Sequence, residues 1–430
     1  MNPTLYHEIR DPIYGAVRFS RSEYQIINHR FVQRLRGIRQ LGFTHYPFPG
    51  ATHTRFCHSI GIMHLAGVAF ESVFRDHPFK DEEHARQLKH CVRMAALLHD
   101  LGHGPYSHAA EFAMPKAHTL KVTKDLNRKA SHEDYTVAIL LFSDLCSTIG
   151  ENFSFDGRHV AGLIDTSLTV PDDFFRIEGF DLRGILSQLI SSNLDVDRLD
   201  YLVRDSFFSG TKYGQVDVHW LVSHLSRHID DEGNVYLALE RNAIYAFEDF
   251  LLSRLQMFLN VYFHPKSIAY ELMFQQVLNS EGCTYVLPSD LDEYLFYDDS
   301  HLWQYVRTSE HPFAKRIVSQ NQYKVVFERH GTPQVIDLHA RQLALKEAGI
   351  NVLIGTSIGV AYQNPKSRKK QIYGLGRALE GVRKAVPLSQ LCDIRSEICI
   401  SRLFVPKEQL VEASAIMQSM DSSAEQYHLF

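Results

Sequence analysis

The chain has 430 residues, of which 45% are hydrophobic and 22% charged, a composition typical of a globular protein with one large domain and a smaller one. No run of 18 apolar residues predicts a transmembrane helix, and the net charge of −5 gives no overall attraction to nucleic acid. The N-terminus lacks the basic and apolar blocks of a signal peptide, and the six cysteines show no CxxC pairing. We therefore expect a cytoplasmic protein with reduced thiols, without a membrane or nucleic-acid partner.

Residues 1–290 predict a mainly helical domain, because apolar side chains recur there at a spacing near 3.6 residues. The clearest helical segments are 22–41, 55–76, 86–100, 132–149, 185–206 and 243–280. Residues 114–128 contain a proline and several lysines, and they predict an exposed loop or lid.

Residues 291–430 predict a smaller α+β region. Strand-like runs occur at 324–328, 334–338, 352–355 and 398–404, and helical patterns at 343–348 and 407–420. One basic cluster lies between them, formed by Lys366, Arg368, Lys369 and Lys370. It is typical of a solvated loop, and the alternative is a contact to phosphate or nucleotide.

Two histidines, His58 and His99, share the apolar stripes of their helices and therefore point inward, where an unpaired polar group is costly. Asp100 follows His99 directly, just before two glycines and a proline that end the helix. Neighbours on a helix diverge by about 100°, so an adjacent histidine and aspartate can share an ion only near a helix end. This position predicts metal or phosphate chemistry.

The helix at 193–206 presents a polar face with Asp197, Tyr201 and Asp205, opposite an apolar one. Alone it is typical of an exposed helix, but beside the His–Asp pair it is a candidate wall of a site. Two imidazoles and two carboxylates suit Fe, Mn, Zn, Ni or Co better than Ca. An octahedral ion with four protein ligands keeps positions open for water or phosphate oxygens.

Further histidines and arginines surround this set. A phosphoester hydrolase needs a proton donor for the leaving oxygen, and a histidine near its ordinary pKa of about 6.5 suits that task. Arginines supply fixed positive charge to a polyphosphate. The candidates are His103, His108, His132 with Glu133, Arg55, Arg198 and Arg254.

These residues resemble the signature of the HD-domain phosphohydrolases, and more narrowly that of the deoxynucleoside triphosphate (dNTP) triphosphohydrolases of the stand-alone bacterial type, without a sterile alpha motif. The resemblance covers most of residues 7–290 and, more weakly, 320–420. Its motifs are 11–15, 31–36, 40–42, 48–51, 55–59, 99–108 and 195–205. It implies a mainly α fold, with a helical HD core at 1–290 and a smaller α+β C-terminal region at 291–430.

The resemblance also implies a role for each site residue. His58, His99, Asp100 and Asp197 would bind one divalent transition metal, and Mg would accompany the substrate triphosphate. His108 would donate a proton to the 5′ leaving oxygen, supported by His132 and Glu133, and Glu111 stands where the relatives have an aspartate. The substrate would be held by Gln40, Leu41, Arg55, His103, Arg198, Tyr201, Asp205, Arg254 and Tyr262. Gln40 and Asp205 would bind the 3′-hydroxyl, and Leu41 and Tyr262 would exclude a ribose hydroxyl.

The implied reaction is hydrolysis of a dNTP to a deoxynucleoside and inorganic triphosphate, by a homodimer or homotetramer with a nucleotide activator between subunits. The activator site retains Gln33 and Arg36 but has Asn28, Arg10 and Pro265 where relatives have aspartate, asparagine and lysine. This chain therefore uses a different nucleotide activator or none. The alternatives are another HD phosphohydrolase (a nucleotidase or phosphodiesterase) or a non-catalytic nucleotide-sensing protein.

Overall fold

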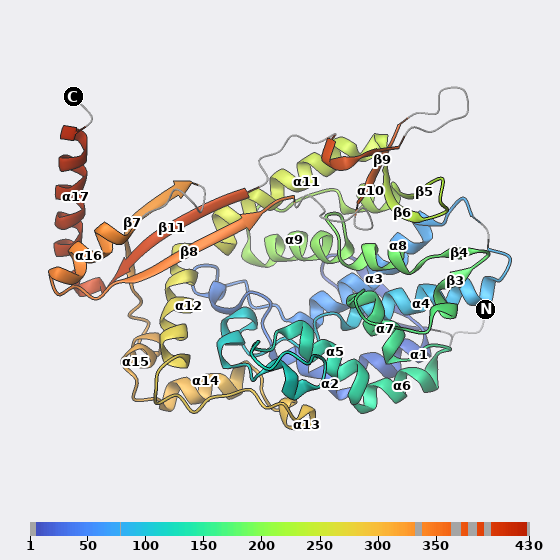
Figure 1. Ribbon diagram of the computed structural model, residues 1–430, viewed down its shortest axis with the longest axis horizontal. Coiled ribbons are helices and arrows are strands. Elements are labelled where there is room, and N and C mark those ends of the chain that lie inside the picture. Colours follow the sequence, from blue (N-terminus) through green and yellow to red (C-terminus); the bar gives the residue numbers. More distant parts are fainter. Residues whose placement is uncertain are drawn as a thin grey trace.

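The computed structural model describes residues 6–77, 79–331, 338–362, 371–376, 385–390 and 397–427. A body of packed helices occupies most of these residues, and a three-stranded sheet extends along one side of it toward the C-terminal helix (Figure 1). The predicted fold class, mainly α with a smaller α+β C-terminal region, is confirmed.

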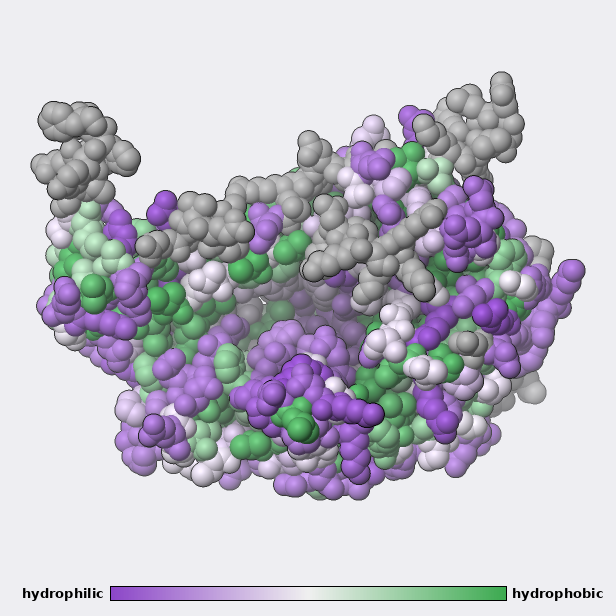
Figure 2. Space-filling model, viewed as in Figure 1, coloured by the Kyte–Doolittle hydropathy of each residue, from purple (hydrophilic) through white to green (hydrophobic). Residues whose placement is uncertain are grey.

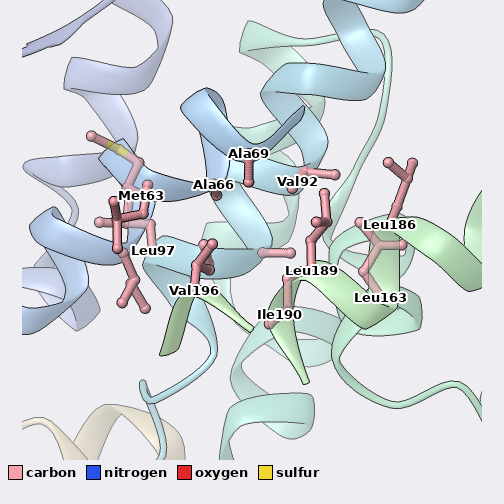
Figure 3. Packing of buried hydrophobic residues seen from close by; sticks show 14 of the residues in the cluster. Met63, Ala66, Ala69, Val92, Leu97, Leu163, Leu186, Leu189, Ile190 and Val196 are labelled. Atoms are coloured by element: carbon pink, nitrogen blue, oxygen red, sulfur yellow. The ribbon is translucent and has the colours of Figure 1, made fainter. Parts of the chain in front are cut away.

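The core of the body is built around helix α3 (Arg55–Val73), which is buried on nearly all sides. It packs against α4 (Glu82–Leu98), α8 (Arg183–Ile190) and α9 (Val196–Ser209). Figure 3 shows Ala66 and Ala69 of α3 close to Val92 of α4 and Leu189 of α8. Among the described helices, α3 alone has the length and composition of a membrane span, but 72% of that window is buried inside the protein. An all-round apolar helix of this kind is typical of a protein core.

The N-terminal hairpin of β1 (His7–Asp11) and β2 (Gly15–Phe19) packs against α3, and the short helix that follows it contacts α4 through Glu23. The predicted helical segment at 22–41 is divided, because the chain turns at Asn28 and again after Gly37. Besides α3 and α4, the first 164 residues form the α-helices α1 (Arg21–Ile27), α2 (Arg30–Arg34), α5 (His132–Phe142), α6 (Asp144–Asn152) and α7 (Gly157–Ile164).

Other long helical segments predicted from the sequence are also divided, each at a residue that caps a new helix. Ser143 ends α5, and its hydroxyl accepts a hydrogen bond from the N–H of Leu145 in α6. Asp195 is the N-cap of α9 and accepts the Arg198 N–H at 2.7 Å. The segment 243–280 forms α11 (Ile244–Met257), a π-helix (Phe258–Tyr262) and α12 (Pro265–Leu278). The proline stands at the first turn of α12, where its missing N–H costs nothing.

A four-stranded sheet joins two distant parts of the chain and was not predicted. Its order is β10-β9-β6-β5, formed by β5 (Leu225–Ile229), β6 (Val235–Glu240), β9 (Tyr373–Leu375) and β10 (Ala385–Pro387). Strands β6 and β9 are parallel, and Leu239 lies opposite Gly374. The short helix α10 (Val218–Ser223) precedes this sheet, and a two-stranded hairpin links β3 (Arg176–Ile177) to β4 (Phe180–Asp181).

After residue 290 three further helices precede the predicted strands: α13 (Leu291–Tyr294), α14 (Asp299–Thr308) and α15 (Pro312–Val318). The antiparallel sheet β7-β11-β8 follows, with β7 (Lys324–Gly331), β8 (Leu353–Val360) and β11 (Glu397–Val405). Helices α16 (His339–Glu347) and α17 (Leu410–Tyr427) pack against each other at one end of it. The predicted strands at 324–328, 352–355 and 398–404 and the two helices are confirmed, while the strand at 334–338 and the basic cluster lie in or extend into parts outside the described residues.

The predicted loop at 114–128 is only partly exposed. Met114, Ala117 and Leu120 are buried in a second apolar cluster with α12, whereas residues 124–129 are exposed. The division of the chain at residue 290 stays a prediction.

Candidate active site

Four predicted ligands converge at the point where α3, the end of α4 and the start of α9 meet. His58 Nε2 lies 3.0 Å from Asp197 Oδ1, and His99 Nε2 lies 3.6 Å from the same oxygen. His99 is the C-cap of α4, so the chain turns there and brings Asp100 Oδ1 to 3.1 Å from His99 Nε2. The adjacent His99 and Asp100 therefore flank one point, as the helix-end position predicts.

In both histidines a hydrogen bond to Nδ1 determines that Nε2 faces the other ligands. His58 Nδ1 hydrogen-bonds Asp200 Oδ2 at 2.7 Å, and His99 Nδ1 hydrogen-bonds the Ala96 carbonyl at 2.9 Å. When each Nδ1 carries the proton, Nε2 presents a lone pair to the centre. Asp200 is fully buried and in turn accepts two hydrogen bonds from Arg204, at 2.8 and 2.9 Å.

The donors fit a divalent transition metal. His58 is 0% exposed, and its Nε2 has no partner with hydrogen-bond geometry among the described residues. Such an atom is costly unless a ligand uses it. One ligand atom each of His58, His99 and Asp197 lies within 4.8 Å of the others, and Asp100 completes an N/O set. Burial lowers the pKa of His58, but Asp197 and Asp200 outweigh burial and raise it to about 10. This negative potential also attracts a cation.

A second group of imidazoles lies beside the first. The rings of His103 and His132 stack with centroids 3.9 Å apart, and the His108 ring lies across both. Glu111 Oε1 joins two of them, at 2.9 Å from His108 Nδ1 and 3.0 Å from His132 Nδ1. Burial raises the pKa of Glu111, but the hydrogen bonds from these histidines outweigh it and lower the pKa to about 2. Glu111 is therefore a carboxylate at neutral pH and orients both rings.

A pocket of about 320 Å³ opens between the two groups. Its lining includes ten of the predicted site residues: Gln40, Arg55, His99, Asp100, His103, His108, His132, Glu133, Asp197 and Tyr201. Ile164, Ile190 and Ser191 also line it, and sequence patterns gave no indication of them. Among the histidines that line this pocket, His108 is the most exposed, with 70% of its side chain accessible.

Arg55 reaches this pocket from the first turn of α3, but its guanidinium is already engaged. It donates to Asp100 Oδ2 and, at 2.9 Å, to Ser107 Oγ. Burial raises the pKa of Asp100, but Arg55, His99 and His103 together outweigh burial and hold the pKa well below its usual range. Burial and the same arginine lower the pKa of His103, which favours a neutral imidazole there.

Two predicted sugar-binding residues, Asp205 of α9 and Tyr262 of the π-helix, form a hydrogen-bonded network. Neither of them is among the residues that line the pocket, and Leu41, Arg198 and Arg254 also lie outside that lining. Asp205 Oδ2 accepts the Tyr262 hydroxyl at 2.9 Å, and Asp205 Oδ1 lies 2.8 Å from His53 Nε2. Gln40 Oε1 is buried without a hydrogen-bond partner among the described residues. Leu41 follows it and begins the next short turn. The contact with His53 holds the Asp205 carboxylate of this network in place.

The remaining predicted phosphate contacts are held by protein partners. Arg254 donates to the Tyr201 hydroxyl at 3.0 Å and to the Ala361 carbonyl at 2.7 Å. Arg198 pairs with Asp195, and its Nε is buried without a partner among the described residues. At the predicted activator site, Arg36 Nε donates to Gln33 Oε1 at 2.8 Å, and an activator there stays a prediction.

Comparison with known proteins agrees with this geometry. The HD domain family matches residues 55–203, and the family described as HD associated region matches residues 216–360. An uncharacterized protein of Mycoplasma genitalium is 31% identical over 275 residues, which cover 62% of this chain and 60% of the relative. The chain thus spans less than two thirds of the length of that curated relative.

Two further comparisons concern activity and fold. A protein of Dictyostelium discoideum named as a deoxynucleoside triphosphate triphosphohydrolase SAMHD1 homolog is 28% identical over 333 residues, which cover 74% of this chain and 60% of the relative. The crystal structure of a hypothetical protein from Aquifex aeolicus superimposes with a TM-score of 0.75 at 24% identity, covering 96% of this chain and all of that one. The latter likeness concerns the fold. The chain thus contains an HD domain followed by an HD-associated region, and it resembles the HD phosphohydrolases that are named as deoxynucleoside triphosphate triphosphohydrolases.

Proposed function

We propose that this protein hydrolyses dNTPs to a deoxynucleoside and inorganic triphosphate with one divalent transition metal. The observation that carries the proposal is the pocket in which the ligand set, the His108–Glu111–His132 group and the Gln40 wall face one another. A bound divalent metal supplies a Lewis acid for a phosphoryl oxygen and acidifies a coordinated water. His58, His99, Asp100 and Asp197 would hold it.

The chain's own residues supply the proton and the orientation. His108 hydrogen-bonds Glu111 through Nδ1, which leaves Nε2 available to give a proton to the 5′ oxygen as it leaves. The Glu111 carboxylate lies 2.9 Å from this Nδ1 and orients the ring. On the opposite wall, the unpartnered Gln40 Oε1 can accept a hydrogen bond from a 3′-hydroxyl. A ligand with that hydroxyl would satisfy a buried acceptor.

The substrate class is also supported by the network of Asp205 and Tyr262. Tyr262 is held by Asp205 beside Tyr201, so its ring position is fixed. A fixed ring beside C2′ would reject a ribose hydroxyl sterically, which is consistent with the activity in the name of the Dictyostelium relative. An enzyme acting on simple phosphomonoesters would not need this network.

The test is a product assay on the purified protein with each dNTP, alone and mixed, in the presence of Mn²⁺, Mg²⁺ or Fe²⁺. We expect inorganic triphosphate and deoxynucleoside. Asp197→Ala should lose both bound metal and activity, whereas His108→Ala should keep the metal and lose activity about 10²- to 10⁴-fold. His219→Ala, an exposed histidine of α10, is the matched control and should behave as wild type. A fully active His108→Ala would refute the proton-donor role, and release of pyrophosphate or phosphate alone would indicate another HD phosphohydrolase.

A further inference from the structure

A buried carboxylate outside the HD motifs connects two walls of the pocket. Asp299, the first residue of α14, is 8% exposed. Its Oδ1 accepts the N–H of Tyr106 at 2.7 Å, and its Oδ2 accepts the N–H of Arg39 at 3.1 Å. Tyr106 stands two residues before His108, and Arg39 stands one residue before Gln40. One side chain therefore joins the loop of the proton donor to the wall of the sugar site.

The segment that Asp299 holds has a strained backbone. Tyr106 and Ser107 have φ angles of 53° and 56°, two consecutive residues in the left-handed region without a glycine. Such a conformation is costly for a residue other than glycine and persists only when its surroundings fix it. The surroundings do so here. The Tyr106 ring stacks on Phe43 at 4.7 Å, and Ser107 Oγ donates to the Arg39 carbonyl at 2.8 Å.

The carboxylate of Asp299 makes no salt bridge among the residues that the structure describes. Burial raises its pKa to about 6, although its hydrogen bonds from two backbone N–H groups and the charge of Arg39 lower it. Burial of this carboxylate therefore disfavours folding. Its two short contacts to backbone N–H groups are therefore better explained by the geometry that they impose than by a contribution to stability.

Neighbouring residues hold the same loop from the same side. Tyr294 donates its hydroxyl to the Gly102 carbonyl at 2.9 Å, and Arg34 donates to the His103 carbonyl at 2.9 Å and to the Tyr294 carbonyl at 3.1 Å. Tyr294 and Asp299 thus contact successive parts of this loop, at Gly102 and at Tyr106. Both lie outside the part of the chain that matches the HD domain family.

We propose that Asp299 is a positioning residue, which sets the distance between the His108 loop and the Gln40 wall through the backbone N–H groups of Tyr106 and Arg39. It contacts neither the predicted metal ligands nor the pocket. The inference rests on the proposed function for its kinetic test and on hydrogen exchange for an independent one.

The experiment compares Asp299→Ala and Asp299→Asn with Asp298→Asn, the matched control. Asp298 is the N-cap of α14 and accepts the His301 N–H, which asparagine also does, and it makes no hydrogen bond to either wall. We expect Asp299→Ala to keep its metal and to lower kcat for dNTPs about 10- to 100-fold, as displacements near 1 Å do. The ratio of deoxy- to ribonucleotide turnover should also change, because the Gln40 wall moves. Asp299→Asn retains one acceptor oxygen and should fall between Asp299→Ala and wild type.

Amide hydrogen exchange gives the readout that needs no substrate. Peptides containing Tyr106 and Arg39 should exchange faster in Asp299→Ala and unchanged in Asp298→Asn. Unchanged exchange at both positions would overturn the proposal. So would a loss of kcat that only follows the folded fraction with an unaltered deoxy-to-ribo ratio. If wild type forms no triphosphate, the proposed function fails, while faster exchange confined to both segments would still support the positioning role.

Discussion

Asp200 orients the predicted metal ligand His58, although it does not itself line the pocket. It accepts the Nδ1 proton of His58 at 2.7 Å and is itself fixed by Arg204, which also reaches Asp11 at 2.8 Å. A carboxylate behind a metal-binding histidine selects its tautomer and raises its basicity. The predicted metal site therefore depends on the buried Asp200–Arg204 pair as well as on its four predicted ligands.

Asp200→Asn should weaken metal binding without unfolding the protein. Asparagine keeps an oxygen that can accept from His58 or Arg204 but removes the negative charge, so we expect a 10- to 100-fold loss of metal affinity, about the effect usual for such partners. Metal titration by calorimetry measures it. Asp249→Asn, an exposed carboxylate of α11, removes the same charge and should leave the affinity unchanged. Wild-type affinity in Asp200→Asn would show that Asp197 and Asp100 alone determine it.

The predicted site residues were accessible from the sequence because they stand in short motifs or at helical spacing. His99 and Asp100 are adjacent, and Asp197, Tyr201 and Asp205 share one face of α9. Asp200 stands three residues after Asp197 and four before Arg204, a spacing that indicates neighbours on a helix. The sequence does not show that this pair lies behind His58, because that contact crosses 142 residues and depends on how α3 packs on α9.

At the scale of the element, α3 and α9 approach closely at Gly61. A Cβ atom there would lie 2.2 Å from Arg204 Nη2 and 2.2 Å from Asp200 Oδ1. These atoms are fixed in a buried ion pair and cannot move aside without breaking it. The glycine thus lets α3 bring His58, one turn earlier, against the carboxylates of α9.

Gly61→Ala should therefore reverse the ordinary effect of that substitution. Alanine in a helix interior is normally more stable than glycine by about 1 kcal/mol, but here we expect a lower melting temperature and weaker metal binding. Gly184→Ala in α8 is the matched control, because a Cβ atom there has nothing within 4 Å and should be neutral or stabilising. Thermal unfolding of both variants decides the matter, and equal melting temperatures would contradict the close packing.

The long core helices α3 and α4 were predicted well. Helix α4 has one buried face along its length, whereas α3 is buried on nearly all sides, so its apolar positions fit a helix without marking one face. Periodicity did not predict where longer segments divide, since the breaks at Ser143 and Asp195 depend on caps. Nor did it predict the four-stranded sheet, in which β6 pairs with the neighbouring β5 and with β9 more than 130 residues away in the chain. Local pattern carries no information about such pairing.

At the scale of the whole molecule, the site is completed by parts of the chain far from the HD motifs. Arg254 is anchored to the Ala361 carbonyl at the end of β8, and Arg402 of β11 donates to the Phe263 carbonyl at 2.8 Å, next to Tyr262. Figure 2 shows hydrophilic and hydrophobic residues interspersed on the face seen in Figure 1, which is hollowed near its centre. The C-terminal part of the chain therefore holds Arg254 and the end of the π-helix in place.

The N-terminal hairpin and helix α1 are attached to this body by buried apolar residues and by buried ion pairs, one of which makes the stability of the fold depend on pH. Glu23 of α1 accepts from Arg93 of α4 at 2.6 Å, from His90 at 3.0 Å and from the Ser20 N–H at 2.8 Å. Burial raises the pKa of Glu23, but these partners outweigh burial and lower the pKa to about 2.

Because the pKa of Glu23 is lower in the folded than in the unfolded state, its stabilisation is complete above pH 4.5 and is lost as the pH falls toward 2. The difference corresponds to a contribution on the order of 3 kcal/mol. Glu23→Gln should lower the free energy of unfolding at pH 7, and urea titrations should show its gap to wild type narrowing from pH 5 to pH 3. Glu8→Gln breaks an exposed pair with Arg18 and should cost at most about 1 kcal/mol. A gap for Glu23→Gln that stays constant from pH 7 to pH 3 would show that its loss comes from packing and not from the charge of this carboxylate.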